Sequence, residues 1–130
     1  AQKQGIEVER RVNVPETLPF PDTELCTVLM NLLQNALDAN ALAPEGARKW
    51  LRVDLHVRGI HLYIGVENSR FAPVDYDEES GLCHTTKQDR SSHGYGLKAA
   101  QAVARKYRSE LLLKFPDGAF SAATALQMPD

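Results

Sequence analysis

Cysteine is scarce in this 130-residue chain, which has only two. Cys26 falls within a helical pattern and Cys83 within a segment that shows no pattern, and together they form neither a metal-binding spacing nor a disulfide framework. Structural disulfides belong to oxidising compartments. The sequence therefore favours the cytoplasm.

Long apolar runs and dense basic stretches are also missing. Each apolar stretch is broken by Asn, Asp or Arg well before the roughly 20 residues that a membrane span needs, and residues 1–5 have no signal-peptide character. Lys and Arg number 15 against 17 Asp and Glu, and no segment concentrates them as a nucleic-acid groove does. We expect a soluble domain that contacts neither nucleic acid nor a membrane.

The residues that are present have the balance of a globular protein. Hydrophobic residues make up 43% and charged residues 25%, which argues against a disordered or fibrous chain. The length suits one hydrophobic core and not two. We therefore expect residues 1–130 to fold as a single domain.

Apolar periodicity predicts the order of the secondary-structure elements. The expected strands are 6–12, 50–58, 60–68, 111–115 and 120–128, and the expected helices are 22–42 and 97–107. Asp22 or Thr23 can cap the first helix, and Gly59 joins the second and third strands in a tight connection. Residues 69–93 show no periodicity, and a loop of that length in a small domain has a function or is disordered. This order predicts an α+β sandwich with helices on one face of a mixed sheet.

One stripe of the first predicted helix carries amides and acids. At about 100° per residue, five polar side chains fall within one narrow sector: Glu24, Thr27, Asn31, Asn35 and Asp38. The sector is either the solvated face of an amphipathic helix or a set of oxygen ligands. Solvated faces usually carry Lys, Glu, Arg and Gln, yet residues 25–43 contain no Lys, Arg or Glu. A hard cation such as Mg²⁺ accepts amide and carboxylate oxygens, and completes its octahedron with water and substrate phosphates.

A turn that contains two glycines precedes the second predicted helix, with the sequence His93-Gly94-Tyr95-Gly96-Leu97. Glycines before a helix allow the backbone to approach a ligand closely, and the first helical N–H groups favour an anion such as phosphate. Thr85, Thr86 and Lys87 add hydroxyls and a cation that the preceding loop can bring over phosphates. An ordinary tight turn and a solvated loop are the alternatives. The four histidines are scattered and assemble neither a metal cluster nor a nucleophilic triad.

Two segments in this order carry a resemblance, and they are Leu29-Met30-Asn31-Leu32-Leu33-Gln34-Asn35-Ala36-Leu37-Asp38-Ala39 and His93-Gly94-Tyr95-Gly96-Leu97. They resemble the N box and the second glycine box of the superfamily of gyrase, heat-shock chaperones, histidine kinases and MutL repair proteins (GHKL). The first strand, the Thr-Thr-Lys segment and the Asp117-Gly118 hairpin also match, so the resemblance covers almost the whole chain. The chain is most similar to sensor histidine kinases related to peptide-pheromone quorum-sensing receptors and to citrate-type sensors. The implied fold is a Bergerat-type two-layer α/β sandwich, with a mostly antiparallel sheet of about five strands and an ATP lid over residues 69–93.

This resemblance implies the catalytic domain of a protein histidine kinase, which binds ATP and Mg²⁺. Asn35 would be the Mg²⁺ ligand and Asn31 would support the phosphates or the metal, which makes these two the catalytic residues. Gly94 and Gly96 would border the triphosphate, and Lys87 would belong to the lid. The implied nucleotide-binding residues are Asn31, Asn35, Asp38, Asn68, Thr86, Lys87, His93, Gly94, Tyr95, Gly96 and Leu97.

Two positions distinguish this chain within the superfamily. Members that hydrolyse ATP typically have a Glu that activates water four residues before the metal-binding Asn; here that residue is Asn31, which cannot take a proton at neutral pH. Phosphotransfer is therefore favoured over hydrolysis. Most members read the adenine amino group with an Asp followed by glycines, whereas this chain has Asn68-Ser69-Arg70. The Asn68 oxygen can still accept that hydrogen bond, but the missing charge weakens binding by something like 1 kcal/mol.

The expected reaction is transfer of the γ-phosphate of ATP to a histidine on a separate dimerisation domain of a two-component sensor kinase. That domain and a response regulator are the expected partners. We expect the isolated domain to be a monomer with little turnover, and the parent protein to be anchored in the membrane. Two alternatives stay open: a nucleotide-binding-deficient pseudokinase that acts as a docking module, and a GHKL serine kinase of the anti-sigma type.

Overall fold

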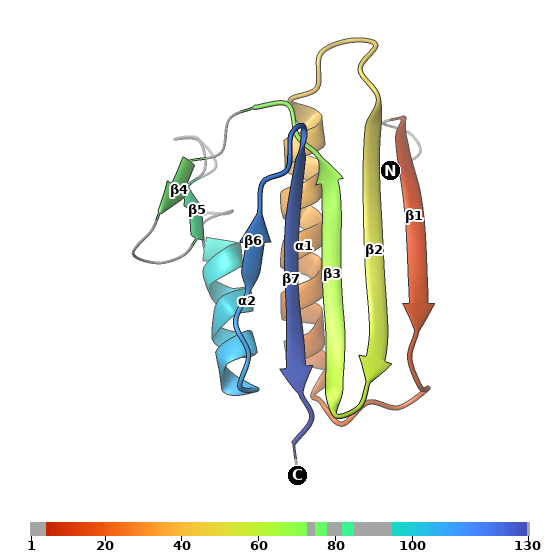
Figure 1. Ribbon diagram of the computed structural model, residues 1–130, viewed down its shortest axis with the longest axis vertical. Helices are drawn as coiled ribbons and strands as arrows, with labels where there is room; N and C mark the ends of the chain where they lie inside the picture. The colour runs from red at the N-terminus through yellow and green to blue at the C-terminus, as the bar shows by residue number, and fades with distance from the viewer. Residues whose placement is uncertain (1–4, 73–74, 78–81, 85–94, 130) are drawn as a thin grey trace.

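The protein forms two layers, a five-stranded sheet and two helices that lie on one of its faces (Figure 1). The computed structural model describes residues 5–72, 75–77, 82–84 and 95–129. Its elements are β1 (Ile6–Asn13), α1 (Asp22–Ala41), β2 (Lys49–Arg58), β3 (His61–Ser69), β4 (Asp75–Asp77), β5 (Leu82–His84), α2 (Tyr95–Lys106), β6 (Leu112–Lys114) and β7 (Ala119–Gln127). The predicted α+β sandwich with helices on one face is confirmed.

The large sheet is mixed, with the strand order β1-β2-β3-β7-β6. β1 runs parallel to β2, and every other pair in this sheet is antiparallel. Since parallel neighbours need a crossover connection, α1 lies between β1 and β2 in the chain and packs across the sheet. β2 and β3 form a hairpin whose turn contains Gly59 at a φ of 61°, a backbone conformation that glycine adopts without steric cost.

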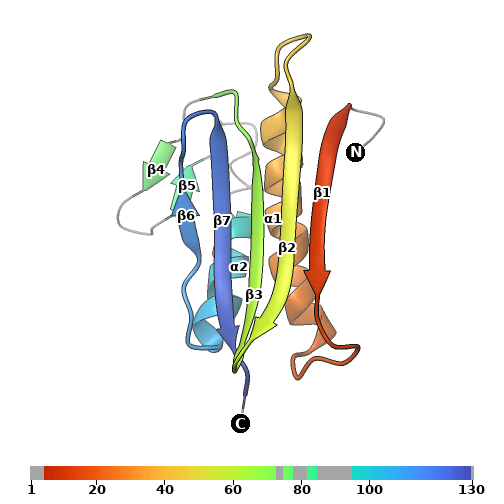
Figure 2. The same ribbon diagram turned by 45° about the vertical axis from the view of Figure 1, so that its right-hand side comes forward.

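The core lies between the sheet and the two helices, as the turned view in Figure 2 shows. On α1, the buried side chains recur every four residues, at Val28, Leu32 and Ala36. On α2, Ala100 and Ala104 are fully buried, and their small size lets this helix pack closely against its neighbours. The core side chains from the central strand β3 are Leu62, Ile64 and Val66, which alternate along it.

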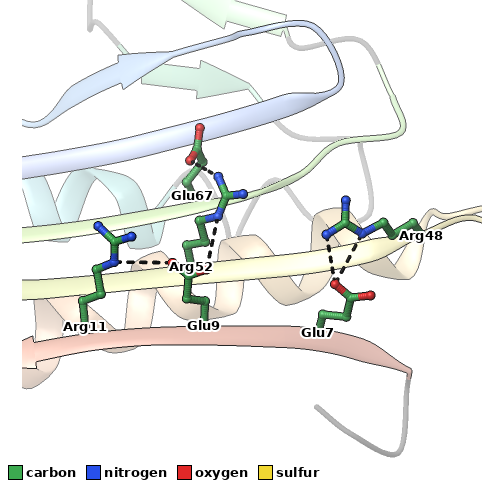
Figure 3. A network of polar contacts seen from close by, with 6 residues as sticks. All are labelled: Glu7, Glu9, Arg11, Arg48, Arg52 and Glu67. Carbon is green, nitrogen blue, oxygen red and sulfur yellow. Dashed lines mark hydrogen bonds and ion pairs between the residues drawn. The ribbon is translucent and has the colours of Figure 1, made fainter.

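The other face of the sheet is open and carries charged side chains from β1, β2 and β3 (Figure 3). Arg52 lies between Glu9 and Glu67, at N–O distances of 4.0 Å and 3.2 Å. Arg11 also contacts Glu9, at 3.4 Å. Because these ion pairs are largely exposed, each contributes little to stability. They mark this face as solvated and leave the helix-covered face as the place for a buried site.

Two local predictions differ from the structure. The N-cap of α1 is Pro21, with no side-chain capping hydrogen bond, so the expected cap at Asp22 or Thr23 was wrong. The Pro21 carbonyl instead accepts the N–H groups of Glu24 and Leu25. Residues 69–93 were expected to lack regular elements, yet they contain the short antiparallel pair β4 and β5. Strands of three residues are too short to show a periodicity.

In the part of the chain that the structure describes, neither helix is long and apolar enough to cross a membrane.

Candidate functional site

The polar stripe of α1 faces α2 along part of its length. The sequence alone could not show whether this stripe faces solvent or another element. Glu24, in the first turn of α1, meets Lys106 at the end of α2, while Asn31 meets Gly96 near the start of α2. The two helices therefore run antiparallel along this seam. Asn35 lies one turn, roughly 6 Å, further along α1 than Asn31. By this geometry it is placed just beyond the start of α2, the end toward which the N–H groups of a helix point.

Asn31 and Gly96 approach so closely that a side chain at position 96 has no room. A Cβ built on Gly96 would lie 2.6 Å from the Asn31 Oδ1 atom and 3.2 Å from its Cγ atom. The Asn31 Nδ2 atom donates a hydrogen bond of 2.6 Å to the carbonyl of Thr27, which fixes the orientation of the amide. Gly96 is therefore needed here for close packing. The two predicted motifs are in direct contact.

The next two polar residues of the stripe are half-buried. The side chain of Asn35 makes no hydrogen bond within the described part of the chain, so its oxygen is available to a ligand. Asp38 accepts a hydrogen bond of 3.0 Å from the Gln34 Nε2 atom. An amide oxygen and a carboxylate at the mouth of a helix N-terminus combine metal ligands with anion-binding N–H groups. This donor set fits a cation that is bound together with phosphates.

A cluster of charged and aromatic side chains closes the other end of the helix seam. The Lys106 ammonium donates to the Glu24 carboxylate at 2.6 Å, and the Tyr107 hydroxyl donates to the same carboxylate. These two hydrogen bonds hold the pKa of Glu24 below its ordinary value, and the same contacts raise the pKa of Lys106 and of Tyr107. Tyr107 also packs edge-on against Phe20. Glu24 is therefore a structural residue and not part of the ligand set.

Asn68 lies at the end of β3, on the side of the sheet that faces the helices. It continues the alternation of Ile64 and Val66 and is 1% exposed. Its Nδ2 atom donates a hydrogen bond of 2.8 Å to the carbonyl of Ser69. Asn68 is thus buried in the same layer as the inner face of α1.

The remaining predicted site residues are placed only in part. Leu97 is 1% exposed and belongs to the hydrophobic core, so it supports the start of α2 from below. Tyr95 is the first residue of α2. Outside the described residues lie Thr86, Lys87, His93 and Gly94. The structure therefore brings Asn31 and Gly96 together and leaves the lid without a description.

Two buried polar residues were missed from the sequence. Asn40, in the last turn of α1, and Ser69, at the end of β3, are each 2% exposed and hydrogen-bonded to each other. Asn40 falls outside the polar stripe of α1, which is why the helical pattern did not single it out. An Asn on an otherwise apolar helix face was the available signal, because buried amides need hydrogen-bond partners.

The sequence pattern of the GHKL domain family matches residues 22–127. Among the curated proteins, none matches the chain in sequence.

Three solved structures share the fold. The catalytic domain of histidine kinase ThkA, in a nucleotide-free form, superposes with a TM-score of 0.71 at 17% identity, over 99% of this chain and 84% of that one. The Acinetobacter baumannii histidine kinase AdeS gives 0.66 at 13% identity, over 99% of this chain and 57% of that one. The histidine kinase domain of the blue-light-activated kinase of Erythrobacter litoralis gives 0.67 at 15%, over 98% and 58%.

This chain therefore spans less than two thirds of the last two structures and most of the first. At these low sequence identities the structural matches show the fold alone. The family is shown by the sequence pattern, which covers most of the chain. The chain belongs to the GHKL domain family, and it has the fold of a histidine kinase catalytic domain.

Proposed function

We propose that this domain binds ATP with Mg²⁺ and donates the γ-phosphate to a histidine on a separate dimerisation domain of a two-component sensor kinase. One observation carries the proposal: Asn35 stands one helical turn beyond the Asn31–Gly96 contact, at the N-terminus of α2. In this position the Asn35 oxygen can bind a cation whose phosphate ligand accepts hydrogen bonds from the N–H groups of α2. The same geometry supports Asn35 as the metal ligand and Asp38 as a neighbouring acceptor.

The residues at the site fit a magnesium ion in their chemistry. Mg²⁺ prefers oxygen ligands and usually keeps several waters and substrate phosphates in its shell. When bound, it would neutralise charge on the β- and γ-phosphates. Asn35 offers its oxygen for this ion, and Asn31 keeps the wall between the two helices rigid through its contact with Gly96. The residues of this chain then position the nucleotide and exclude water from the inner side.

Position 31 supports phosphotransfer over hydrolysis. The Asn31 Nδ2 atom is engaged by the Thr27 carbonyl, and Oδ1 rests against Gly96. An amide in this arrangement cannot accept a proton from water. The acceptor of the phosphate is therefore expected to come from elsewhere, and to be already nucleophilic, as an imidazole is.

Two histidines of the sheet lie away from the proposed site, which disfavours them as that acceptor. His56 stacks on Tyr63 and contacts Asp54 on the open face of the sheet, away from α1 and α2. His61 lies at the start of β3, at the far end from Asn68. We propose that the acceptor histidine belongs to a dimerisation domain and that a response regulator then receives the phosphate. The parent kinase would be membrane-anchored with this domain in the cytoplasm.

The test is a calorimetric titration of a non-hydrolysable ATP analogue into the domain, with and without Mg²⁺. Saturable binding that depends on Mg²⁺, and is lost in Asn35→Ala, supports the proposal. Met30→Ala is the matched control, because Met30 is on the same helix, is 61% exposed and lies outside the polar stripe. Mixing the domain with a dimerisation domain and labelled ATP then shows whether phosphate reaches a histidine.

Two other functions keep a specific basis in the sequence. The Asn68-Ser69-Arg70 segment replaces the Asp and glycines of most relatives, which is the reason to consider a docking module with a disabled site. Absence of heat and of thermal stabilisation at millimolar nucleotide would favour that module. A serine kinase of the anti-sigma type would be recognised by labelling of serine in a partner in place of histidine.

A further inference from the structure

We propose that Asn40 and Ser69 orient the side-chain amide of Asn68, and thereby make the site prefer a purine with a 6-amino group over one with a 6-oxo group. This role rests on the proposed nucleotide function and names the residues that determine base specificity within it. Three buried polar side chains, each 1–2% exposed, meet where α1, β2 and β3 end or begin: Asn40, Asn68 and Ser69. Burial of polar groups is costly unless each is hydrogen-bonded. Their arrangement is therefore fixed to one geometry.

Ser69 is the centre of this cluster. Its hydroxyl accepts the Trp50 N–H at 3.0 Å and donates to the Asn40 Oδ1 atom. The Asn40 Nδ2 atom donates to the Trp50 carbonyl at 3.2 Å and to the Ala36 carbonyl at 3.3 Å. The backbone N–H and the carbonyl of Trp50 are thus both hydrogen-bonded to side chains. The last turn of α1 is tied to the start of β2 and to the end of β3.

These contacts replace the last step of the β2–β3 ladder. Backbone pairing ends at Leu51 and Asn68, so Trp50 and Ser69 are not a backbone pair. Asn68 and Ser69 are buried in succession, which the regular alternation of a strand does not give. The end of β3 is turned toward α1 in this way. Ser69 still pairs with Ala119 of β7, so its backbone stays within the sheet on that side.

Arg70 fixes the chain immediately after this point. Its N–H donates to the Gly118 carbonyl at 2.9 Å, and its guanidinium donates to the carbonyls of Ala119 at 2.9 Å and Pro116 at 3.1 Å. Where most relatives have glycines, this chain therefore has two residues that anchor the strand end to α1 and to the β6–β7 turn. Asn68 is presented from a rigid backbone.

The orientation of the Asn68 amide follows from these anchors. The Ser69 carbonyl can only accept a hydrogen bond, so the NH₂ group of Asn68 must face it, at 2.8 Å. The Oδ1 atom is then turned away, and no donor among the described residues bonds to it. An acceptor in this position matches the 6-amino group of adenine and opposes the 6-oxo group of hypoxanthine or guanine. If the Ser69 carbonyl were free to move, the amide could reverse and donate a hydrogen bond from its NH₂ group to the oxo group instead.

The experiment compares the binding of ADP and IDP, which differ in the 6-amino and 6-oxo group, by calorimetry with Mg²⁺. We expect the wild-type domain to bind ADP roughly tenfold more tightly, the value of one hydrogen bond. In Asn40→Ala and in Ser69→Ala this ratio should fall toward one. Ser69→Ala removes a single oxygen, and it keeps the test open if Asn40→Ala does not fold. Thr124→Val is the matched control, since Thr124 is 2% exposed and bonds to Ser109 on the β7 side of the core.

An Asn68→Asp background separates orientation from a general loss of structure. Both carboxylate oxygens accept hydrogen bonds, so orientation no longer matters, and adding Ser69→Ala should leave the ADP-to-IDP ratio unchanged. The proposal is overturned if the ratio survives Asn40→Ala and Ser69→Ala in folded proteins, or if Thr124→Val lowers it equally. It is also overturned if the ratio falls in the Asn68→Asp background. A wild-type domain that binds neither nucleotide would refute the proposed function itself, whereas selective binding with insensitive variants refutes only the role of Asn40 and Ser69.

Discussion

Replacing Gly96 with alanine tests the close approach of the two helices. Two effects of opposite sign act on stability. Alanine is better than glycine within a helix by about 1 kcal/mol. Against this, the new Cβ would stand 2.6 Å from the Asn31 Oδ1 atom, and relief requires the Asn31 side chain to leave its hydrogen bond to Thr27. Overpacking of this kind costs about 1–3 kcal/mol.

We therefore expect Gly96→Ala to lower the free energy of unfolding by about 1 kcal/mol, the difference between these two effects. The midpoint of thermal unfolding should fall by roughly 3–4 °C. In an Asn31→Ala background the obstacle is gone, and the same change should raise stability by up to about 1 kcal/mol. The coupling between the two positions is then about 2 kcal/mol.

The assay is urea unfolding of four proteins at neutral pH: wild type, each single variant and the double variant. A change of sign between the two backgrounds supports the contact. If Gly96→Ala stabilises the domain equally in both, Asn31 does not press on Gly96 and the placement of Asn35 beyond the start of α2 loses its basis.

Three further outcomes are expected from other contacts. Glu24→Gln should destabilise the domain at neutral pH, because the Glu24 carboxylate stabilises the fold only when it is ionised. The difference in stability from wild type should vanish as the pH falls from the unfolded pKa of 4.5 through the lower folded pKa. Thermal melts across pH measure this difference, and a constant difference at acid pH would contradict the reasoning. Arg70→Lys keeps the charge but loses the planar fork, so amide hydrogen exchange in the β6–β7 turn should accelerate; unchanged exchange at Gly118 and Ala119 would count against the anchor. Leu32→Ala, at a 1% exposed position, should cost about 2–5 kcal/mol in urea unfolding, and a loss below 1 kcal/mol would place Leu32 outside the core.

The helices and the central strands were predictable because their patterns are long and lie on both sides of one core. Helix α1 was expected at 22–42 and spans 22–41. β1 shows the limit of such patterns. Val8 and Val12 lie on the same face as the buried Ile6, yet they are 43% and 57% exposed. Alternation in a strand indicates two faces and does not say whether anything packs on either.

The site was predictable in its parts and not in its assembly. Asn31, Asn35 and Gly96 were identified from residue type and spacing. The contact of Asn31 with Gly96 depends on how α2 packs on α1, and the small residues Ala100 and Ala104 that allow it carry no functional pattern. Asn40 and Ser69 are 29 positions apart in the chain, so their hydrogen bond appears only once β3 and α1 are placed together. Which residues line the lid side stays a prediction.

The two edges of the sheet affect how this domain behaves at high concentration. An exposed edge strand offers unpaired N–H and C=O groups to another chain and is a common route to aggregation. β1 carries four charged residues among its eight, in the sequence IEVERRVN. β6, at the opposite edge, is only three residues long. Charge and shortness both disfavour the joining of two such sheets edge to edge. The domain is therefore expected to stay dispersed at the concentrations that calorimetry requires, with its edges protected even when it is separated from the rest of a kinase.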